Sequence, residues 1–236
     1  MNLENKKPNI RHLHEMKEVI YDKEWLSQAN LNMELYYMYR DLTESQQDKE
    51  EAVTNQLRYD ITVLLPVMLG KEYNKTKGHD HPKKPNTNLT YPELYEVLEG
   101  EAIFLIQDSQ ENAIKDVKII RAKKNDKIII PPNYEHVMIN PTEKEAKTCN
   151  WVYRGMESNI YEPFIEKQGF SYYAIKEENN IKWIRNQNYK NIPLITEESP
   201  NKTYQTEIPT DEPVYELINN PEKLDFLKNP QNYNWG

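Results

Sequence analysis

Residues 93 to 154 constrain the fold most, because this stretch alternates short strand-like segments with turns and has no amphipathic helix pattern. The segments are rich in β-branched and aromatic residues, and they span about 93–98, 101–108, 114–121, 126–131, 135–140 and 147–154. Turn residues such as Glu99-Gly100 and Asn140-Pro141 separate them. Many short strands in succession predict an all-β sandwich or closed barrel of antiparallel strands.

The sequence divides into three parts around this run. Residues 1–31 are polar and weakly periodic, and they predict an N-terminal arm that wraps the domain. Residues 32–190 are the predicted barrel domain, with further strands at 33–40 and 58–66, a short polar helix or loop at 45–57, and a hairpin at 170–176 and 181–185. Residues 191–236 hold six of the fifteen prolines, which exclude a long helix or an inner strand. They predict an extended strap, with a brief helix at about 221–228, that packs on its own domain or on a partner subunit.

Charge and cysteine content exclude several classes of function. The formal net charge of -8 opposes general attraction to nucleic acid or to an anionic membrane surface, so an anionic ligand must be held by local donors. The single cysteine, Cys149, excludes an intramolecular disulfide and a cysteine-based zinc cluster, and it is predicted to be a small core residue. The sequence has no apolar run of membrane-spanning length and no signal-peptide pattern, so we expect a cytoplasmic protein.

Three of the five histidines and one glutamate have the spacing of a metal site. His79 and His81 are two residues apart, so on an extended segment both imidazoles point to the same side. Glu93 opens the next predicted strand and His136 lies in a later one, so closure of a barrel can bring all four side chains inward. Three imidazoles and a carboxylate suit a divalent ion of iron, manganese, cobalt, nickel or zinc, and they leave coordination positions for water or substrate.

A second histidine pair and three basic residues are not assigned to a site. His12 and His14 have the same spacing as the pair above, but they precede a polar stretch and are interpreted as a surface or packing pair. Lys75, Lys77 and Arg154 are interpreted as charges on solvated faces.

The sequence around Glu93 and His136 resembles the two conserved motifs of the cupin superfamily. Cupins are small double-stranded β-helices, or jelly-roll barrels, with a metal site of three histidines and one glutamate. The resemblance implies this fold here, with short helices and extended N- and C-terminal segments outside the barrel. The family normally has glycine where Asn125 and Asn133 stand, and because Asn tolerates left-handed backbone conformations we predict positive φ at both. The residues that carry the resemblance are Glu93, Gly100, Asn125, Pro131, Asn133, His136 and Asn140.

A narrower resemblance, to the archaeal-type cupin glucose-6-phosphate isomerases, runs from about residue 57 to 189. It is carried in order along the chain by 62–66 (TVLLP), 74–81 (NKTKGHDH), 92–100 (PELYEVLEG), 131–136 (PPNYEH) and 166–171 (EKQGFS). It implies one divalent metal ion per subunit, Fe2+ foremost and Mn2+, Ni2+ or Zn2+ as alternatives, bound by His79, His81, Glu93 and His136. It also implies that Tyr95 lines the site and that the sugar phosphate is held by Thr62, Thr76, Gly78, Tyr153 and Tyr161.

The activity implied by this resemblance is the interconversion of glucose 6-phosphate and fructose 6-phosphate. The charge of the enediolate that forms when the C2 proton leaves would be stabilised by the metal ion. Glu93 is the candidate base for proton transfer and Tyr95 a hydrogen-bond donor to the sugar, with a metal-promoted hydride shift as the alternative. The tyrosines and threonines of the site are equally typical of half-buried strand packing. Because cupin barrels commonly pair, we expect a homodimer.

Three departures from the family bear on the substrate, and the first is that the N- and C-terminal extensions have no recognised counterpart in it. Residues 82–89 lengthen the loop between His81 and Glu93 beside the predicted mouth of the pocket, and Asn159 stands where the family has a histidine. Mannose 6-phosphate is therefore an alternative substrate. A non-haem iron dioxygenase is an alternative reaction with the same metal ligands, and a sugar-binding cupin without turnover is an alternative outside catalysis.

Overall fold

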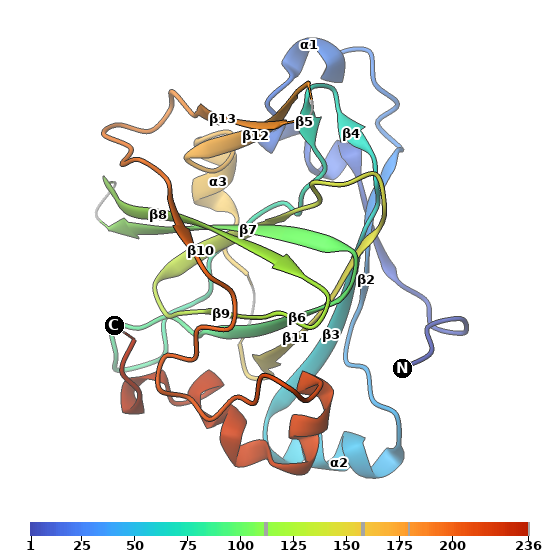
Figure 1. The fold of residues 1–236 in the computed structure, drawn as a ribbon, viewed down its shortest axis with the longest axis vertical. Helices are drawn as coiled ribbons and strands as arrows, with labels where there is room; N and C mark the ends of the chain where they lie inside the picture. The colour runs from blue at the N-terminus through green and yellow to red at the C-terminus, as the bar shows by residue number, and fades with distance from the viewer. Residues whose placement is uncertain (111–112, 157–158, 179, 236) are drawn as a thin grey trace.

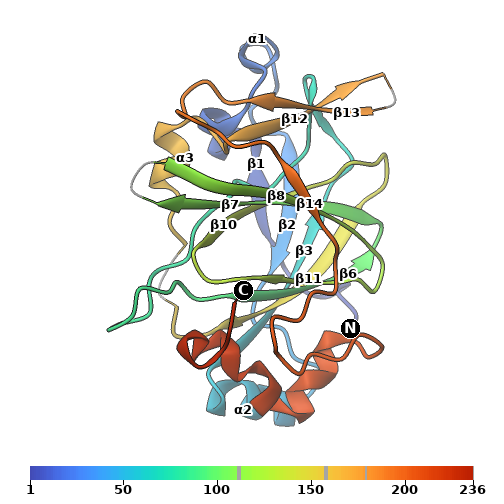
Figure 2. The ribbon, with the colours of Figure 1, turned by 60° about the vertical axis from the view of Figure 1, so that its left-hand side comes forward.

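The computed structural model describes residues 1–236 except 111–112, 157–158, 179 and 236 (Figure 1). Two sheets form the barrel and a third lies at one end of it (Figures 1 and 2). The first sheet has the order β1 (Asn9–His12), β2 (Glu34–Tyr39), β3 (Leu57–Leu64), β11 (Ala146–Tyr153), β6 (Glu93–Glu99) and β9 (Lys127–Ile130). The second has the order β10 (Tyr134–Ile139), β7 (Glu101–Gln110), β8 (Ala113–Lys123) and β14 (Thr196–Glu198). The third has the order β13 (Asn180–Arg185), β12 (Tyr172–Glu177), β5 (Glu72–Tyr73) and β4 (Met68–Leu69).

The strand order makes the barrel a jelly roll, as the resemblance to the cupins implied. Isolated bridges from Lys75 to Ile139 and from His79 to His136 place the segment 74–80 beside β10, so the second sheet runs from this segment through β10 and β7 to β8. The first sheet combines β3, β11, β6 and β9, so the chain crosses from β6 to the hairpin β7–β8 in the second sheet, returns in β9, and crosses again to β10 and back to β11, as in a jelly roll. The core between the sheets includes Leu64, Val97, Phe104, Ile128 and Met138.

Both predicted left-handed asparagines are confirmed, because φ is 73° at Asn125 and 68° at Asn133. Asn133 also makes one side-chain contact that glycine could not make, besides a backbone contact that glycine could keep. Its side-chain Oδ1 accepts a hydrogen bond from Thr90 N at 3.0 Å, and its own N–H donates to Thr90 Oγ1 at 2.6 Å. The asparagine side chain thus ties the turn before β10 to the chain that leads into β6.

Short helices lie outside the barrel. The α-helices are α1 (Lys23–Leu26), α2 (Gln46–Thr54) and α3 (Glu162–Glu166), and the 3-10 helices are η1 (Leu13–Glu15), η2 (Lys17–Val19), η3 (Val214–Asn219), η4 (Pro221–Leu227) and η5 (Pro230–Asn232). Ser45 begins α2 as its N-cap, accepting a hydrogen bond from Asp48 N at 3.0 Å. No helix in the described part of the chain is long and apolar enough to cross a bilayer.

The N-terminal segment contributes to the main core. Its strand β1 extends the first sheet by pairing with β2, and four of its side chains are fully buried in the core cluster. These four are Leu13, Met16, Val19 and Ile20. The first thirty residues therefore help to stabilise the barrel by hydrophobic burial.

The C-terminal segment covers the outer face of the first sheet. Its apolar residues form a second cluster with outward-facing side chains of β3, β6 and β11, and η3 lies beside α2 below the barrel (Figure 1). Trp151 Nε1 donates to Val214 O at 2.7 Å, and Glu96 Oε2 accepts a hydrogen bond from Val214 N at 2.7 Å. The strand β14 adds a short parallel edge to β8 (Figure 2). The segment thus packs on its own domain, and Cys149 lies fully buried beneath it as a core residue.

Candidate metal centre

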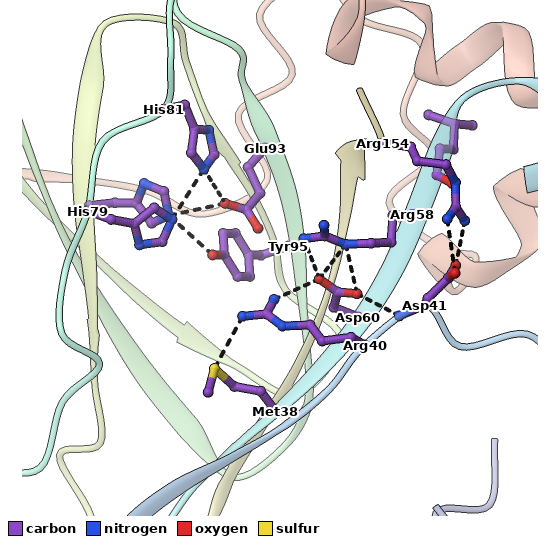
Figure 3. A network of polar contacts seen from close by, with 12 residues as sticks. Met38, Arg40, Asp41, Arg58, Asp60, His79, His81, Glu93, Tyr95 and Arg154 are labelled. Carbon is purple, nitrogen blue, oxygen red and sulfur yellow. Dashed lines mark hydrogen bonds and ion pairs between the residues drawn. The ribbon is translucent and has the colours of Figure 1, made fainter. Parts of the chain in front are cut away.

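The four predicted metal ligands come together from three parts of the barrel. Gly78 has φ of 76°, and after it His79 pairs with His136 on β10 through two backbone hydrogen bonds of 3.1 Å each. Glu93 is the first residue of β6 and points into the same space. The donor atoms of His79, His81, Glu93 and His136 all lie within 4.8 Å of one another (Figure 3). Closure of the barrel thus brings these four side chains, which come from three segments, into one compact cluster.

The donor atoms face one another at short distances. His79 Nε2 lies 3.2 Å from His81 Nε2, and Glu93 Oε2 lies 3.3 Å from His81 Nε2 and 3.1 Å from His136 Nε2. His81 Nδ1 donates to the carbonyl oxygen of Tyr91 at 2.7 Å, so the neutral ring carries its lone pair on Nε2. Imidazole lone pairs that converge on a carboxylate oxygen fit a divalent cation.

The orientation of the ligands is fixed by burial. His81, Glu93 and His136 are each at most 3% exposed. Glu93 Oε2 and His136 Nδ1 are buried without a hydrogen-bond partner among the described residues. A buried carboxylate oxygen in that position costs free energy unless a charge compensates it, and a bound cation supplies that charge.

The protonation states of three of the four residues suit metal binding. Burial alone would lower the pKa of His81, but the neighbouring Glu93 carboxylate outweighs burial and raises it. Burial, followed by the neighbouring His136 and His81, lowers the pKa of His79 well below its usual value. Burial also lowers the pKa of His136. Burial alone would raise the pKa of Glu93, but the imidazoles of His136 and His81 beside its carboxylate outweigh burial and hold the pKa well below the usual range. Neutral imidazoles and an ionised carboxylate are the forms that ligate metals.

A cavity adjoins this cluster, and most of the predicted substrate residues line it. Thr62 on β3, Thr76, Gly78 and Tyr161 line it together with Tyr95 on β6. The Tyr95 hydroxyl lies 3.2 Å from His136 Nε2. Tyr153 does not line the cavity within the described residues; its ring packs on that of Tyr91 at a centroid distance of 4.8 Å. Asn159, which replaces a family histidine, lines the cavity.

Two cavity residues escaped the sequence analysis: Arg40 and Arg58. Both contact the buried carboxylate of Asp60, and all three flank Tyr95 (Figure 3). The spacing of Arg58, Asp60 and Thr62 could have revealed part of this cluster. Residues 58, 60 and 62 of one strand point to the same face, so the two charged residues could be expected beside Thr62. The sequence analysis placed these residues in strands but assigned their side chains no role.

The interpretation of Lys75 as a solvated charge is wrong. Lys75 is 6% exposed, and its ammonium donates to Val19 O at 2.8 Å and to Glu72 Oε1 at 2.5 Å. Lys77 is half-buried and lines the cavity, with Nζ 5.6 Å from the centre of the Tyr161 ring. Arg154 pairs with Asp41, and one of these hydrogen bonds measures 2.9 Å. The fold places Lys75 beside Glu72, which the sequence pattern could not reveal.

The loop at 82–89 reaches the C-terminal strap. Lys84 Nζ donates to Lys228 O at 2.6 Å and to Asn229 Oδ1 at 2.8 Å. The backbone of Lys84 also pairs with that of Leu89 at 2.9 Å. The additional residues of this loop therefore connect the chain between two metal ligands to the strap.

Residues 10–193 match the glucose-6-phosphate isomerase (GPI) family. The chain belongs to this family. The match covers the whole barrel and all four members of the metal cluster, and the family assignment bears out the resemblance inferred from the sequence motifs. The match begins at Ile10, so the expectation that the N-terminal segment has no counterpart in the family is wrong for most of its length. It ends at Pro193, before most of the C-terminal strap.

Curated relatives named glucose-6-phosphate isomerase come from several archaea. The protein of Pyrococcus horikoshii is 29% identical over 189 residues, which cover 80% of this chain and 92% of the relative. That of Pyrococcus furiosus is 28% identical over 188 residues, covering 80% and 91%. That of Thermococcus litoralis is 27% identical over 180 residues, covering 76% and 86%.

Solved structures give weaker similarities. A recombinant oxalate oxidase in complex with glycolate is 14% identical with a TM-score of 0.41, covering 55% of this chain and 56% of that one. The Lactobacillus farciminis oxalate decarboxylase formate complex is 16% identical with a TM-score of 0.40, covering 54% and 31%. These scores add nothing to the strand order, on which the fold assignment rests.

Proposed function

We propose that this chain is a metal-dependent, cytoplasmic glucose-6-phosphate isomerase that interconverts glucose 6-phosphate and fructose 6-phosphate. One observation carries the proposal: in a chain of this family, three imidazoles and a carboxylate converge within 4.8 Å at a cavity lined by hydroxyl groups. The hydroxyls can bind a phosphorylated sugar while its reacting end meets the cluster.

The metal ion in the proposal is held by His79, His81, Glu93 and His136, one ion per subunit. Fe2+ is our first choice, and Mn2+, Ni2+ and Zn2+ suit the same mixture of nitrogen and oxygen ligands. When bound, such an ion supplies positive charge for the sugar oxygen on which negative charge develops during isomerisation.

Glu93 and Tyr95 have the proposed chemical roles. Glu93 is the buried carboxylate at the reacting end of the cavity and takes up the proton that moves between C2 and C1. Tyr95, whose hydroxyl lies beside His136, donates a hydrogen bond to the sugar. A direct hydride shift is the alternative, and it leaves no proton for Glu93 to exchange with water.

Substrate anchoring is the proposed role of Thr62, Thr76, Gly78 and Tyr161. Their hydroxyls and main chain would hold the phosphate and orient the reacting carbons. Tyr153 has the same proposed role, which requires its side chain to turn from Tyr91 toward the cavity. The cavity has a volume of about 50 Å³, room for a few waters, so side chains must move to admit a hexose phosphate.

A pair of double variants tests this proposal. His79→Ala with His81→Ala removes two ligands, whereas His12→Ala with His14→Ala removes a histidine pair of the same spacing on the first sheet edge. We expect the first variant to lose bound metal, measured by elemental analysis, and isomerase activity, while the second keeps both. Assays with added Fe2+, Mn2+, Ni2+ or Zn2+ on glucose 6-phosphate and mannose 6-phosphate identify the metal and the sugar. A folded wild type without turnover on either sugar contradicts the proposal.

We further propose that the protein is a homodimer. Extended terminal segments that pack on a sheet can contact a second subunit as well as their own. Light scattering at micromolar concentration should give twice the chain mass of 28.2 kDa. A mass of one chain contradicts it.

A further inference from the structure

The loop between two members of the metal cluster is attached to the C-terminal strap. Residues 82–92 join His81 to Glu93, so the residues at both ends of this loop are metal ligands in the proposal. Lys84 Nζ donates to Lys228 O at 2.6 Å and to Asn229 Oδ1 at 2.8 Å. These two hydrogen bonds, which we call the loop–strap contact, have no role in the isomerase proposal.

The strap side of this contact is firmly anchored. Leu224, Phe226 and Leu227 of η4 are fully buried and pack in the outer cluster against the first sheet. Asn229, just beyond η4, donates from its backbone N–H to Asp225 O at 2.8 Å and from Nδ2 to Asp225 Oδ1 at 2.7 Å. The oxygens that accept hydrogen bonds from the lysine are therefore held in place by packing and by hydrogen bonds within the strap.

On the loop side, Lys84 belongs to a short hairpin. Its backbone N–H donates to Leu89 O at 2.9 Å, and its carbonyl oxygen accepts from Thr87 N at 3.2 Å and from Thr87 Oγ1 at 3.0 Å. Lys83 forms an antiparallel bridge with Thr90 nearer the base of the hairpin. Because these contacts join the two sides of the loop, a displacement of Lys84 is transmitted to residues 90 and 91.

The base of this hairpin orients members of the metal cluster. Tyr91 O accepts the 2.7 Å hydrogen bond from His81 Nδ1, which leaves the other ring nitrogen, Nε2, directed at the cluster. Thr90 exchanges two hydrogen bonds with Asn133, in the turn that precedes β10 and His136. Residues that contact a metal ligand rather than the metal typically change metal affinity by about 10- to 100-fold when they are lost. The hairpin base therefore bears on how firmly the cluster holds an ion.

The tip of the hairpin is mostly exposed. Residues 83, 85, 86 and 88 are exposed, so hydrophobic burial contributes little to the stability of the tip. Segments with few buried contacts open locally at a low cost in free energy. Lys84 is half-buried and its ammonium donates to two oxygens, so the loop–strap contact is stronger than a contact between neutral groups. Loss of this contact would therefore make opening of the loop more frequent.

We propose that Lys84 is a positioning residue, which fastens the hairpin to the strap and thereby slows the loss of the bound metal ion. While the hairpin is closed, Tyr91 O keeps the His81 ring directed at the cluster, and when the hairpin opens His81 loses this support. The inference rests on the proposed function in one respect, namely that the cluster binds a metal ion. It gives η4 and Asn229, which lie beyond the residues that match the family, a role in metal retention besides covering the sheet.

The rate of zinc release tests the proposal on the zinc-loaded protein. The protein is mixed with an excess of a chromophoric chelator, and the absorbance gives the rate at which zinc leaves. We expect Lys84→Met, which removes the donors and nearly keeps the length of the side chain, to release zinc about tenfold faster than wild type. Lys84→Arg, which keeps the charge and the donors, should stay within about twofold of wild type.

The strap side of the contact is tested by Asn229→Ala, which removes one of the two acceptors. We expect zinc release about threefold faster than in wild type. The double variant with Lys84→Met should release zinc no faster than Lys84→Met alone, because both changes act on one contact, and effects that multiply would overturn this. Hydrogen exchange of the metal-free protein gives a second readout: exchange in residues 82–91 should be about tenfold faster in Lys84→Met, with residues 102–106 of β7 unchanged.

Two lysine variants are the controls. Lys83→Met removes the same charge from an exposed neighbouring position of the same loop. Lys127→Met removes a hydrogen bond of 3.1 Å that reaches the strap at Thr210 O from β9 rather than from the loop. Because Lys127 is buried, its loss should lower the midpoint of urea unfolding. Both controls should nevertheless release zinc at the wild-type rate, which separates positioning of the ligands from a general loss of stability.

The outcomes distinguish this inference from the proposed function. Unchanged zinc release in Lys84→Met overturns the inference, as does equally fast release in Lys83→Met or Lys127→Met. If wild type binds zinc and no variant changes its release, the inference alone is rejected. A wild type that binds no divalent ion rejects it together with the proposed metal site. The expected pattern of release without isomerase turnover by wild type rejects the proposed function alone.

Discussion

Asn150 lines the cavity, whereas the next residue of β11, Trp151, is fully buried beneath the C-terminal strap. The same division runs through β3, where Asp60 and Thr62 face inward and Ile61 packs in the outer cluster. At the cavity, this sheet therefore has polar side chains inside the barrel and apolar side chains outside. In a barrel whose outer face meets solvent, the arrangement is the reverse. The inner face can be polar because the strap allows the outer face to provide hydrophobic burial. Residues that line the cavity and residues that stabilise the fold thus alternate along a strand.

Glu93→Gln should give the largest effect on the inner face. It removes the single carboxylate of the metal cluster while preserving side-chain size, so we expect activity to fall by about 100-fold or more and metal affinity to fall with it. Unfolding in urea should change little, because no outer-face contact is lost. Isomerase assays and elemental analysis measure the effect, and full activity in the metal-loaded variant would contradict the assignment of Glu93.

Trp151→Ala should give the largest effect on the outer face. It leaves a cavity under the strap and removes the hydrogen bond to Val214 O, so the free energy of unfolding should fall by about 3–5 kcal/mol. Leu194→Ala, at a side chain that is 76% exposed, is the control and should change it by less than about 0.5 kcal/mol. Urea unfolding gives both values. Equal stability of the two variants would show that the strap does not stabilise the sheet.

Neighbouring substitutions on β3 sharpen the comparison. Thr62→Val removes a hydroxyl from the cavity and should raise KM for the sugar phosphate about tenfold. Ile61→Val removes one methylene from the outer cluster and should lower the free energy of unfolding by about 0.5–1.5 kcal/mol with KM unchanged. Steady-state kinetics and urea unfolding of both proteins separate the two effects. A change in KM for Ile61→Val would mean that the two faces are coupled.

The smallest effect concerns Glu96, the buried carboxylate under the strap. Burial raises its pKa in the folded protein, although the hydrogen bond from Val214 N and the charge of Lys127 act in the opposite direction. A raised pKa means that the folded state binds the proton more tightly, so this stabilisation is full at pH below about 4.5 and is lost as pH rises through the folded pKa. Relative to Glu96→Gln, wild type should lose up to about 1 kcal/mol between pH 4 and pH 7. Parallel unfolding curves at all pH values would exclude this titration.

Much of the fold followed from local patterns in the sequence. The six central strands were predicted within a few residues, because alternation and turn residues are local properties. The cluster of three histidines and Glu93 was predicted because His79 and His81 share a face and because two further motif residues follow at recognisable positions. The φ angles of Asn125 and Asn133 were predicted for the same reason, since turn conformation depends on the residue itself.

The arginine cluster and the cover of the outer face depended on register and packing between distant segments. Arg40 reaches Asp60 only when β2 is paired with β3, and Lys75 is buried only when its segment lies beside Glu72 and Val19. The strap was predicted to pack on its own domain or on a partner, and the contact of Val214 with Trp151 and Glu96 identifies a face of its own sheet.

The sequence by itself determined the strands, the turns and the members of the histidine and glutamate cluster, because these depend on residue type and on recognisable spacing. Only the tertiary structure decided which polar side chains line the cavity and which apolar side chains are buried by the C-terminal strap. The physical reason is that the choice between the two faces of a strand is made by the segments packed against it, and those segments lie far away in the chain.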